Sequence, residues 1–367
     1  MMGYIWQNES WTDFTWDKEK VDALRSRYLY QKGIADGTFS MLSEQTRQIM
    51  IAETLSRETV SSSAIEGVEL MYDSVYSSII RQLDIDLSFK AKQDRNAESV
   101  SRLIIDANSN RSPLSVDRLF DWHRLLFDGV AKGFTPRTIG AFRTGPIYIV
   151  HQSQKDTDII YEGIPTDNIA SEMDSLISYI NSEQEPDYLI RSAVASFWFV
   201  SIHPFEDGNG RISRAIADYV LSSRSDTEFR PYSISEAIIR NRKGYYDALQ
   251  AAQKSSSSDI TDWLVWYIDT VCNSLSDAVE SCRSKLRVSS LMKNLDPGTY
   301  NSRQMMMLYR LADGSFYGKL TAEKWMKMTK CQSATATRDL SGLAEHGLLI
   351  RMGDGGKGTY YILNPNL

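Results

Sequence analysis

Apolar positions recur at helical spacing along most of the chain. The pattern is clearest in residues 44–55, 119–130 and 188–202, where one side of each predicted helix is apolar. The longest apolar run, residues 193–202, is about half of the ~20 residues that a membrane-spanning helix needs. We interpret this run as a buried core helix, and we expect a predominantly α-helical protein.

Two places break the helical pattern. Short β-prone runs at residues 147–150 and 159–161 surround a polar turn at residues 152–158, which predicts a β-hairpin inserted in a helical domain. Near the end of the chain, residues 348–351 and 359–363 flank a glycine-rich segment at 353–358 and follow two or three short predicted helices. Helices followed by such a hairpin are typical of a winged helix-turn-helix.

These patterns divide the chain into three predicted regions. They are an N-terminal helical region at residues 1–85, a central core at 86–285 and a winged helix-turn-helix at 290–367. Four serines at 255–258 predict a linker before another helix that begins near Ile260. We expect the N-terminal tryptophans Trp6, Trp11 and Trp16 to pack against the rest of the protein.

Composition narrows the function. The net charge of −6 argues against binding of nucleic acid or an anionic membrane by the whole chain, although a local basic patch stays compatible with it. The three cysteines include no CxxC pair, which argues against a disulfide framework or a structural zinc site. The first residues lack the basic and apolar regions of a signal peptide, so we expect a cytoplasmic protein in a reducing compartment.

Residues 203–214, with the sequence HPFEDGNGRISR, carry the candidate chemistry. Pro204 and the glycines end the preceding helix, and helical spacing resumes after Gly210. Gly208, Asn209 and Gly210 therefore stand at a helix N-terminus, where free N–H groups suit a phosphate. The two glycines let the backbone approach closely and form a nest for an anion.

Four polar side chains surround this nest. Asp207 offers the oxygen ligand that Mg²⁺ prefers, and Arg211 and Arg214 can meet phosphate oxygens in a forked geometry. His203 can accept a proton at neutral pH. Together these groups indicate phosphoryl or nucleotidyl transfer. The alternative is structural: a core histidine, a glycine turn and arginines paired with surface acids.

The segment matches the Fic signature HPFx[DE]GNGRxxR at every fixed position. The chain thus resembles the Fic family, over about residues 86–285, and the resemblance implies a helical bundle with a β-hairpin flap. It implies transfer of AMP from ATP to a Tyr, Ser or Thr hydroxyl of a protein. By similarity, His203 is the general base, and Asp207 holds Mg²⁺ between the α- and β-phosphates. Gly208, Asn209, Gly210 and Arg211 would hold the phosphates, and Arg214 would contact the γ-phosphate.

The resemblance assigns two further surfaces. The flap would bind the target by strand addition through residues Gly145, Ile147, Tyr148, Ile149 and Val150. Residues Asn241, Tyr245 and Tyr246 resemble the segment that lines the adenosine pocket. A purely structural hairpin and ordinary helix packing are the respective alternatives.

A candidate inhibitor lies upstream of the signature. Ser62, Glu66 and Gly67 match the pattern [S/T]xxxE[G/N] of Fic proteins with an N-terminal inhibitory helix, the class II type. A spacing of four places Ser62 and Glu66 on one helix face, and Gly67 can end that helix. The resemblance implies that Glu66 pairs with Arg214 and so blocks productive ATP binding. In some related enzymes this glutamate instead positions a water that removes AMP, which makes a de-AMPylase the alternative.

The C-terminal region suggests a function of another class. Five basic residues and one acid fall between residues 319 and 338, and the segment resembles winged helices that follow many bacterial Fic domains. A DNA-binding regulator is the hypothesis from this region, with a protein contact as its alternative. The expected partners are therefore ATP, a protein substrate that includes the chain itself among its candidates, and DNA or protein at this region. A homodimer stays open, and no membrane contact is expected.

Overall fold

The computed structural model describes residues 3–86, 89, 91–131, 133–152, 157–182, 185–223, 229–293, 295, 298–313, 316, 318–353 and 358–365. Contacts divide the chain into two compact units. The first unit comprises Met1–Asp36 and Glu44–Ala278, and the second comprises Gly37–Ser43 and Val279–Leu367. In the part of the chain that is described, no helix is both long and apolar enough to cross a bilayer.

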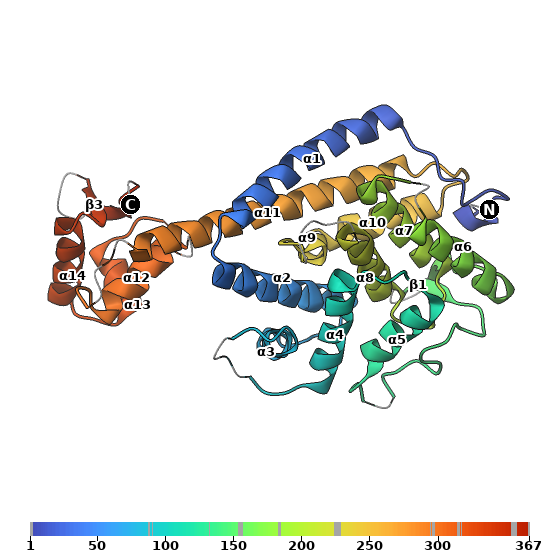
Figure 1. The fold of residues 1–367 in the computed structure, drawn as a ribbon, viewed down its shortest axis with the longest axis horizontal. Coiled ribbons are helices and arrows are strands. Elements are labelled where there is room, and N and C mark those ends of the chain that lie inside the picture. The colour runs from blue at the N-terminus through green and yellow to red at the C-terminus, as the bar shows by residue number, and fades with distance from the viewer. Residues whose placement is uncertain are drawn as a thin grey trace. The chain divides into compact units, whose positions relative to one another are not determined.

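The first unit is mostly helical, which confirms the predicted helix-rich fold (Figure 1). Helices α1 and α11 contribute residues to both units. The helices described for the first unit are η1 (Ile5–Gln7), α1 (Lys18–Ser40), α2 (Glu44–Ile65), α3 (Tyr72–Gln82), α4 (Arg95–Ser109), α5 (Val116–Phe127), η2 (Thr166–Asn168), α6 (Ile169–Asn181), α7 (Tyr188–Ile202), α8 (Asn209–Ser222), α9 (Ile234–Arg240), α10 (Arg242–Gln253) and α11 (Thr261–Lys293).

Helix α7 forms the centre of the first unit, and fourteen of its fifteen residues are buried because neighbours cover it on every side. It packs on α8 and α6. The side chain of Asp187 caps its first turn by accepting hydrogen bonds from the N–H groups of Leu189 and Ile190. The helix ends at His203, whose left-handed backbone (φ 54°) turns the chain into the signature loop.

Helix α2 continues ten residues beyond the predicted segment, which ended at residue 55. The added part is polar in sequence yet buried, and it includes Glu58, Thr59 and Ser62. Thr59 satisfies its own hydroxyl by donating to the Leu55 carbonyl. Apolar spacing alone therefore underestimates this helix, because its buried face is built from paired polar groups.

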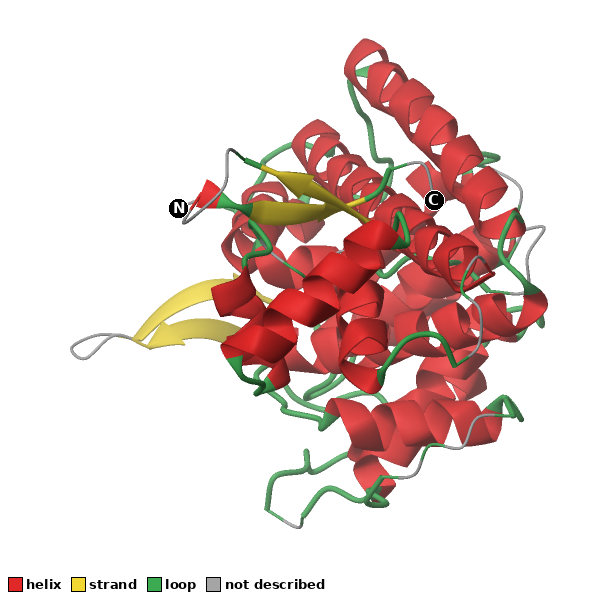
Figure 2. Ribbon diagram, turned by 90° about the vertical axis from the view of Figure 1, so that its left-hand side faces the viewer, coloured by secondary structure: helices red, strands yellow, loops and turns green. Residues whose placement is uncertain are grey.

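The predicted hairpin is present in the first unit (Figure 2, strands in yellow). Strand β1 (Tyr148–Gln152) pairs antiparallel with β2 (Thr157–Glu162), with an irregular register between Ile149 and Val150. Residues 153–156 of the predicted turn lie outside the described residues. Tyr161 is buried at the root of the hairpin and donates from its hydroxyl to the Ser201 carbonyl of α7 (2.8 Å).

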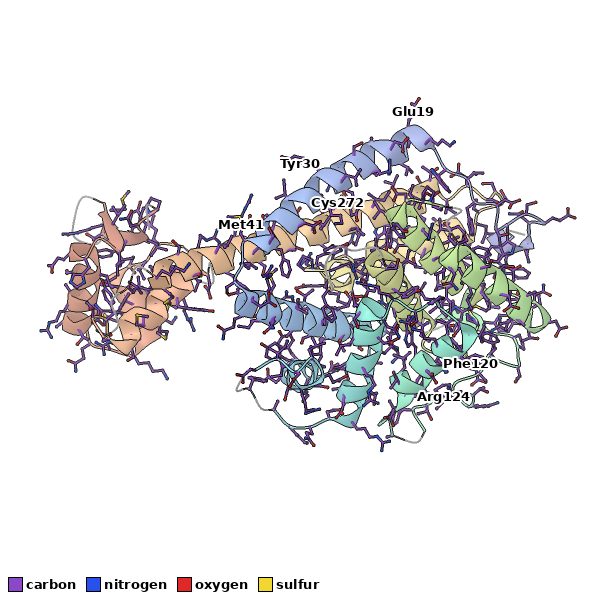
Figure 3. All side chains as sticks on the ribbon, viewed as in Figure 1. Glu19, Tyr30, Met41, Phe120, Arg124 and Cys272 are labelled. Atoms are coloured by element: carbon purple, nitrogen blue, oxygen red, sulfur yellow. The ribbon has the colours of Figure 1, made fainter. Side chains whose placement is uncertain are left out.

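The N-terminal segment packs against the helices behind it. Trp11 is buried edge-on against Trp198 of α7, and Trp6 donates from its indole nitrogen to the Glu162 carbonyl (2.8 Å). Helix α1 is joined to α11 by the ion pair of Arg27 and Asp269 (2.7 Å), whereas Tyr30 on its outer side points into solvent (Figure 3).

The second unit has a core of its own around Trp325, Leu340 and Leu343. A second hairpin, predicted from residues 348–363, follows three short helices in this unit. Leu320 forms a further β-bridge to Tyr361 in the second strand of this hairpin. Residues 354–357 of the predicted glycine-rich turn lie outside the described residues. The elements that lie within this unit are α12 (Ser302–Ala312), α13 (Ala322–Thr329), α14 (Ser333–Glu345), β3 (Leu349–Met352) and β4 (Tyr360–Leu363).

Candidate active site

The candidate site begins where α7 ends and α8 begins. His203 closes α7, and Gly208 adopts a left-handed backbone (φ 83°) as the N-cap of α8. A side chain at position 208 would also meet Leu126, since a Cβ there would lie 2.9 Å from Leu126 Cδ1. Both the left-handed backbone and the close approach of Leu126 therefore require glycine at position 208.

His203 has its imidazole fixed by one backbone contact. The Nδ1 atom lies 3.1 Å from the Val200 carbonyl oxygen, which can only accept, so Nδ1 carries the proton and Nε2 keeps its lone pair. Burial lowers the pKa of His203 to about 4; the Arg143 charge acts in the same direction, and the Val200 hydrogen bond opposes it. The ring is thus neutral at pH 7 and able to take up a proton.

The signature loop is held in shape by hydrogen bonds and ring contacts of Asn209 and His123. The side-chain amide of Asn209 accepts from Phe205 N (3.0 Å) and donates to Phe205 O (2.8 Å). His123 of α5 stacks on the Phe205 ring at a centroid distance of 4.1 Å, and its Nε2 lies 3.1 Å from the Asp207 carbonyl oxygen. His123 therefore supports the loop from α5, and Asn209 uses its side chain within the loop.

Sequence reasoning missed the role of Arg143. This arginine is buried, and its guanidinium donates to the carbonyls of His203 (2.8 Å), Gly145 (2.8 Å) and Ile164. Arg143 thereby joins the signature loop to both ends of the hairpin. In the sequence, Arg143 stands out only because it lies just before the hairpin. That position does not indicate that its side chain is buried.

Asp207 and Arg211 stand at the mouth of the loop. The Asp207 side chain is 58% exposed, and its Oδ1 lies 3.6 Å from Arg211 Nη2. Arg211 is buried with its guanidinium over the Phe127 ring, and among the described residues its Nε has no hydrogen-bond partner. Burial lowers the pKa of Arg211. An exposed carboxylate beside an incompletely paired guanidinium fits a phosphate with its metal ion.

Arg214 is paired with α2 rather than free. Its Nη1 donates to Glu66 Oε1 (2.8 Å), while Nε and Nη2 donate to the hydroxyl (3.0 Å) and carbonyl (2.8 Å) of Ser62. Burial acts to raise the pKa of Glu66, but the charge and hydrogen bond of Arg214 outweigh it, and the pKa lies below its ordinary value. Gly67, with φ 77°, ends this segment.

Glu66 also covers the N-terminus of α8. A Cβ built at Gly210 would lie 2.1 Å from Glu66 Oε1, so the carboxylate rests against the Gly210 backbone. Tyr246 reinforces this position, because its hydroxyl contacts the carbonyl of Ile65 (3.3 Å) and Oε2 of Glu66 (3.4 Å). An acidic side chain thus occupies the place that the helix N-terminus offers to an anion.

The predicted adenosine-pocket residues lie at the start of α10 (Arg242–Gln253). Asn241 is exposed and caps α10 by accepting from Gly244 N (3.2 Å). Tyr245 is buried against Trp266, with ring centroids 5.3 Å apart. Tyr246 is 37% exposed and lies beside Glu66. A role of these residues toward a base stays a prediction.

The hairpin lies beside His203 and exposes part of one face. A Cβ at Gly163, just after β2, would lie 3.1 Å from His203 Cβ and 2.7 Å from Ile147 Cγ2. The root of the hairpin therefore lies directly against the signature loop. Tyr148 and Val150 of β1 are exposed. A two-stranded sheet leaves edges to which a further strand can be added.

Known proteins resemble this chain in two regions. Residues 113–221 match the model described as "Fic/DOC family", and residues 4–85 match "Domain of unknown function (DUF4172)". "Protein adenylyltransferase fic-1" of Caenorhabditis elegans is 23% identical over 141 residues, which are 38% of this chain and 24% of that protein. "Probable protein adenylyltransferase aq_aa38" of Aquifex aeolicus is 22% identical over 167 residues, 44% of each chain. The chain thus spans less than half the length of these curated relatives.

Solved structures show the fold. A Fic family protein from Desulfovibrio desulfuricans G20 is similar over 94% of this chain and 96% of its own, with a TM-score of 0.53 and 18% identity. Fic-1 of C. elegans is similar over 73% of this chain and 74% of its own, with a TM-score of 0.51 and 19% identity. The family match and these folds agree with the geometry of the loop at His203: residues 113–221, which contain this loop, are similar to the Fic/DOC family.

Proposed function

We propose that this protein is an adenylyltransferase that moves AMP from ATP to a hydroxyl group of a protein, and that Glu66 inhibits it. One observation carries the proposal. A neutral imidazole, an exposed carboxylate and two buried arginines converge on the N-terminus of α8, at His203, Asp207, Arg211 and Arg214. The adenylyltransferase names of the curated relatives support this reaction over other phosphate chemistry.

The residues of the chain have distinct parts in this reaction. The substrate oxygen attacks the α-phosphorus of ATP while its proton passes to Nε2 of His203, and the bond from the α-phosphorus to the bridging oxygen breaks to release pyrophosphate. The N-terminus of α8 and Arg211 hold phosphate oxygens. Asp207 would hold Mg²⁺, whose positive charge offsets the charge of the phosphates. The hairpin would align the target segment beside His203.

Inhibition follows from the position of Glu66. Its carboxylate covers Gly210 and engages Arg214, so a terminal phosphate can reach neither group. Two negative groups at one place repel, and ATP must then bind with its α-phosphate out of line. Small misplacement of reacting atoms costs orders of magnitude in rate.

The test compares wild type, Glu66→Gly and His203→Ala with ATP labelled at the α- or the γ-phosphate. We expect Glu66→Gly to raise incorporation of α-label by at least about tenfold, since it frees Arg214 and the helix N-terminus. We expect His203→Ala in the same background to lower it by about 10²- to 10⁴-fold, the usual contribution of a general base. Label retained from the γ-phosphate would instead indicate a kinase, and equal labelling by wild type and Glu66→Gly would remove inhibition from the proposal.

De-AMPylation is the alternative use of the same glutamate. Glu66 lies against Gly210 at the phosphate end of the site, where a carboxylate can orient a water. Incubation of an AMP-modified target with wild type and with Glu66→Gly separates the two directions. Loss of AMP only with wild type would support the hydrolytic function.

A second candidate function belongs to the second unit. Helix α14 follows α13 after a short turn, and its first turns expose Ser333, Thr337 and Arg338, the part of a recognition helix that reads bases. Lys327 and Lys330 of the preceding segment are also exposed. We propose duplex DNA as a ligand of this unit, beside the transferase activity of the first.

A further inference from the structure

Three polar residues stand at four-residue intervals along α2 and just beyond its end. They are Glu58, Ser62 and Glu66, and a spacing of four places them on one side of the helix. The latter two engage Arg214. Glu58, two turns earlier, makes no contact with Arg214 or with the loop at His203 that the structure records. The proposed reaction therefore leaves this buried acid without a function.

Glu58 is bound to the start of α9. Its Oε2 accepts hydrogen bonds from Ser233 Oγ (2.7 Å) and Ser235 N (3.0 Å), and its Oε1 is paired with the Ser235 hydroxyl. Glu58 is 3% exposed, Ser233 6% and Ser235 0%. Three buried donors thus converge on one side chain, and its loss would remove the acceptor that all three share.

The surroundings of Glu58 leave little room for adjustment. A small cavity, with space for about one water, is lined by Glu58, Ser235, Arg214 and Asp218. Asp218 pairs with Arg230, and burial, followed by the charge of Glu58, raises the pKa of Asp218. Glu58 and its partners are buried, and α2 at this point packs directly against α8 and α9.

These contacts fix where the end of α2 lies. An α-helix is stiff over two turns, so the position of Glu58 determines that of Glu66 about 12 Å further along the axis. Contacts at Glu58 and at Ser62 hold α2 at two points. Because the helix is already ordered there, the contact of Glu66 with Arg214 costs little additional backbone entropy.

We propose that Glu58 is a positioning residue for inhibition: by accepting the hydrogen bonds of Ser233 and Ser235, it seats α2 so that Glu66 reaches Arg214 and Gly210. The inference rests on the proposed inhibition by Glu66. In this inference, the hydrogen bonds that Glu58 accepts hold α2 in position, and the negative charge of Glu58 does not. A change in the contact between α2 and the start of α9 would then relieve inhibition without touching the phosphate site.

The experiment measures self-labelling from α-labelled ATP in Glu58→Ala, Glu58→Gln, Glu66→Gly and the double variant Glu58→Ala/Glu66→Gly. We expect Glu58→Ala to raise labelling on the order of tenfold, because three donors lose their acceptor. Glutamine keeps an oxygen for Ser233 Oγ and Ser235 N, and its amide can donate to the Ser235 hydroxyl, so Glu58→Gln should stay as inhibited as wild type. Adding Glu58→Ala to Glu66→Gly should cause no further increase.

Glu53→Ala serves as the matched control on α2, since Glu53 is part-exposed and its ion pair with Arg57 is long (3.9 Å). It should leave labelling unchanged. If Glu58→Ala fails to fold, Ser235→Ala removes one hydroxyl donor with little change in volume, and it should raise labelling about twofold to threefold. Hydrogen exchange adds a second readout: amides of residues 59–66 should exchange faster in the activated variants, with α7 unchanged.

The outcomes separate this inference from the proposed function. If Glu66→Gly does not raise labelling, the inhibition itself is wrong. If Glu66→Gly activates but neither Glu58→Ala nor Ser235→Ala does, the positioning role of Glu58 is wrong. Equal activation by Glu58→Gln and Glu58→Ala would overturn the acceptor argument, and further activation in the double variant would show that Glu58 does not act through Glu66.

Discussion

At the scale of single residues, burial sets the chemistry of the site. Burial is the largest cause that lowers the pKa of His203, and it also lowers that of Arg211. Arg214 differs, because Glu66 offsets the cost of its burial and raises its pKa. A neutral imidazole and the incompletely paired Arg211 are thus brought together, a condition that favours a proton acceptor next to an anion site.

The low pKa of His203 leads to a prediction about pH. For a base to act it must be unprotonated, so activity is lost as pH falls through the pKa of the folded enzyme, which is about 4. The kcat/KM of Glu66→Gly, which reports the free enzyme, should therefore stay level from about pH 8 to about pH 6. A midpoint near ~6.5, the ordinary value for histidine, would contradict the burial of this ring.

At the scale of elements, the hairpin and the catalytic loop behave as one piece because Arg143 binds both. Its guanidinium reaches carbonyls on either side of the hairpin and at His203. Tyr161 adds a hydrogen bond from β2 to α7. The root of the hairpin is therefore tied both to α7 and to the loop at His203.

Replacing Arg143 tests this connection. Arg143→Met should destabilise the first unit by about 2–4 kcal/mol, because several buried carbonyls lose their donor. Arg137→Met, a control with an exposed side chain, should change stability by less than about 0.5 kcal/mol. Urea denaturation followed by circular dichroism measures both. A shift of Arg143→Met no larger than that of the control would contradict the connection.

At the scale of the whole molecule, two units with separate cores carry two candidate functions. The first unit contains the site at His203, and the second has its core around Trp325. Cores that do not share residues allow the functions to be altered separately. The chain is acidic overall, so any DNA contact would have to come from the local basic residues of the second unit.

Binding to duplex DNA tests the second unit. We expect affinity that falls steeply with salt and that drops further in Lys327→Ala/Arg338→Ala, since each lost phosphate contact lowers the salt slope by about 1. Self-labelling by the same variant in the Glu66→Gly background should not change. Absence of binding at about 50 mM salt by fluorescence anisotropy would exclude the DNA function for this unit.

Several features were decided by the sequence alone. Residues 203–214 specify a turn followed by a helix N-terminus, because glycine and proline act locally and apolar spacing restarts at once. The helix at 188–202 and the hairpin runs follow from the same short-range rules, whereas the helix expected at 119–130 is observed at 116–127. The spacing of Ser62 and Glu66 likewise predicted a shared helix face.

Only the tertiary structure decided which distant groups meet. Glu66 and Arg214 are 148 residues apart, and no periodicity relates them. The polar end of α2, the buried Arg143 and the contacts of Glu58 with α9 are equally invisible to patterns of apolar residues, since such patterns count polar positions as exposed. A buried polar group is stable only with a partner, and packing between helices supplies that partner.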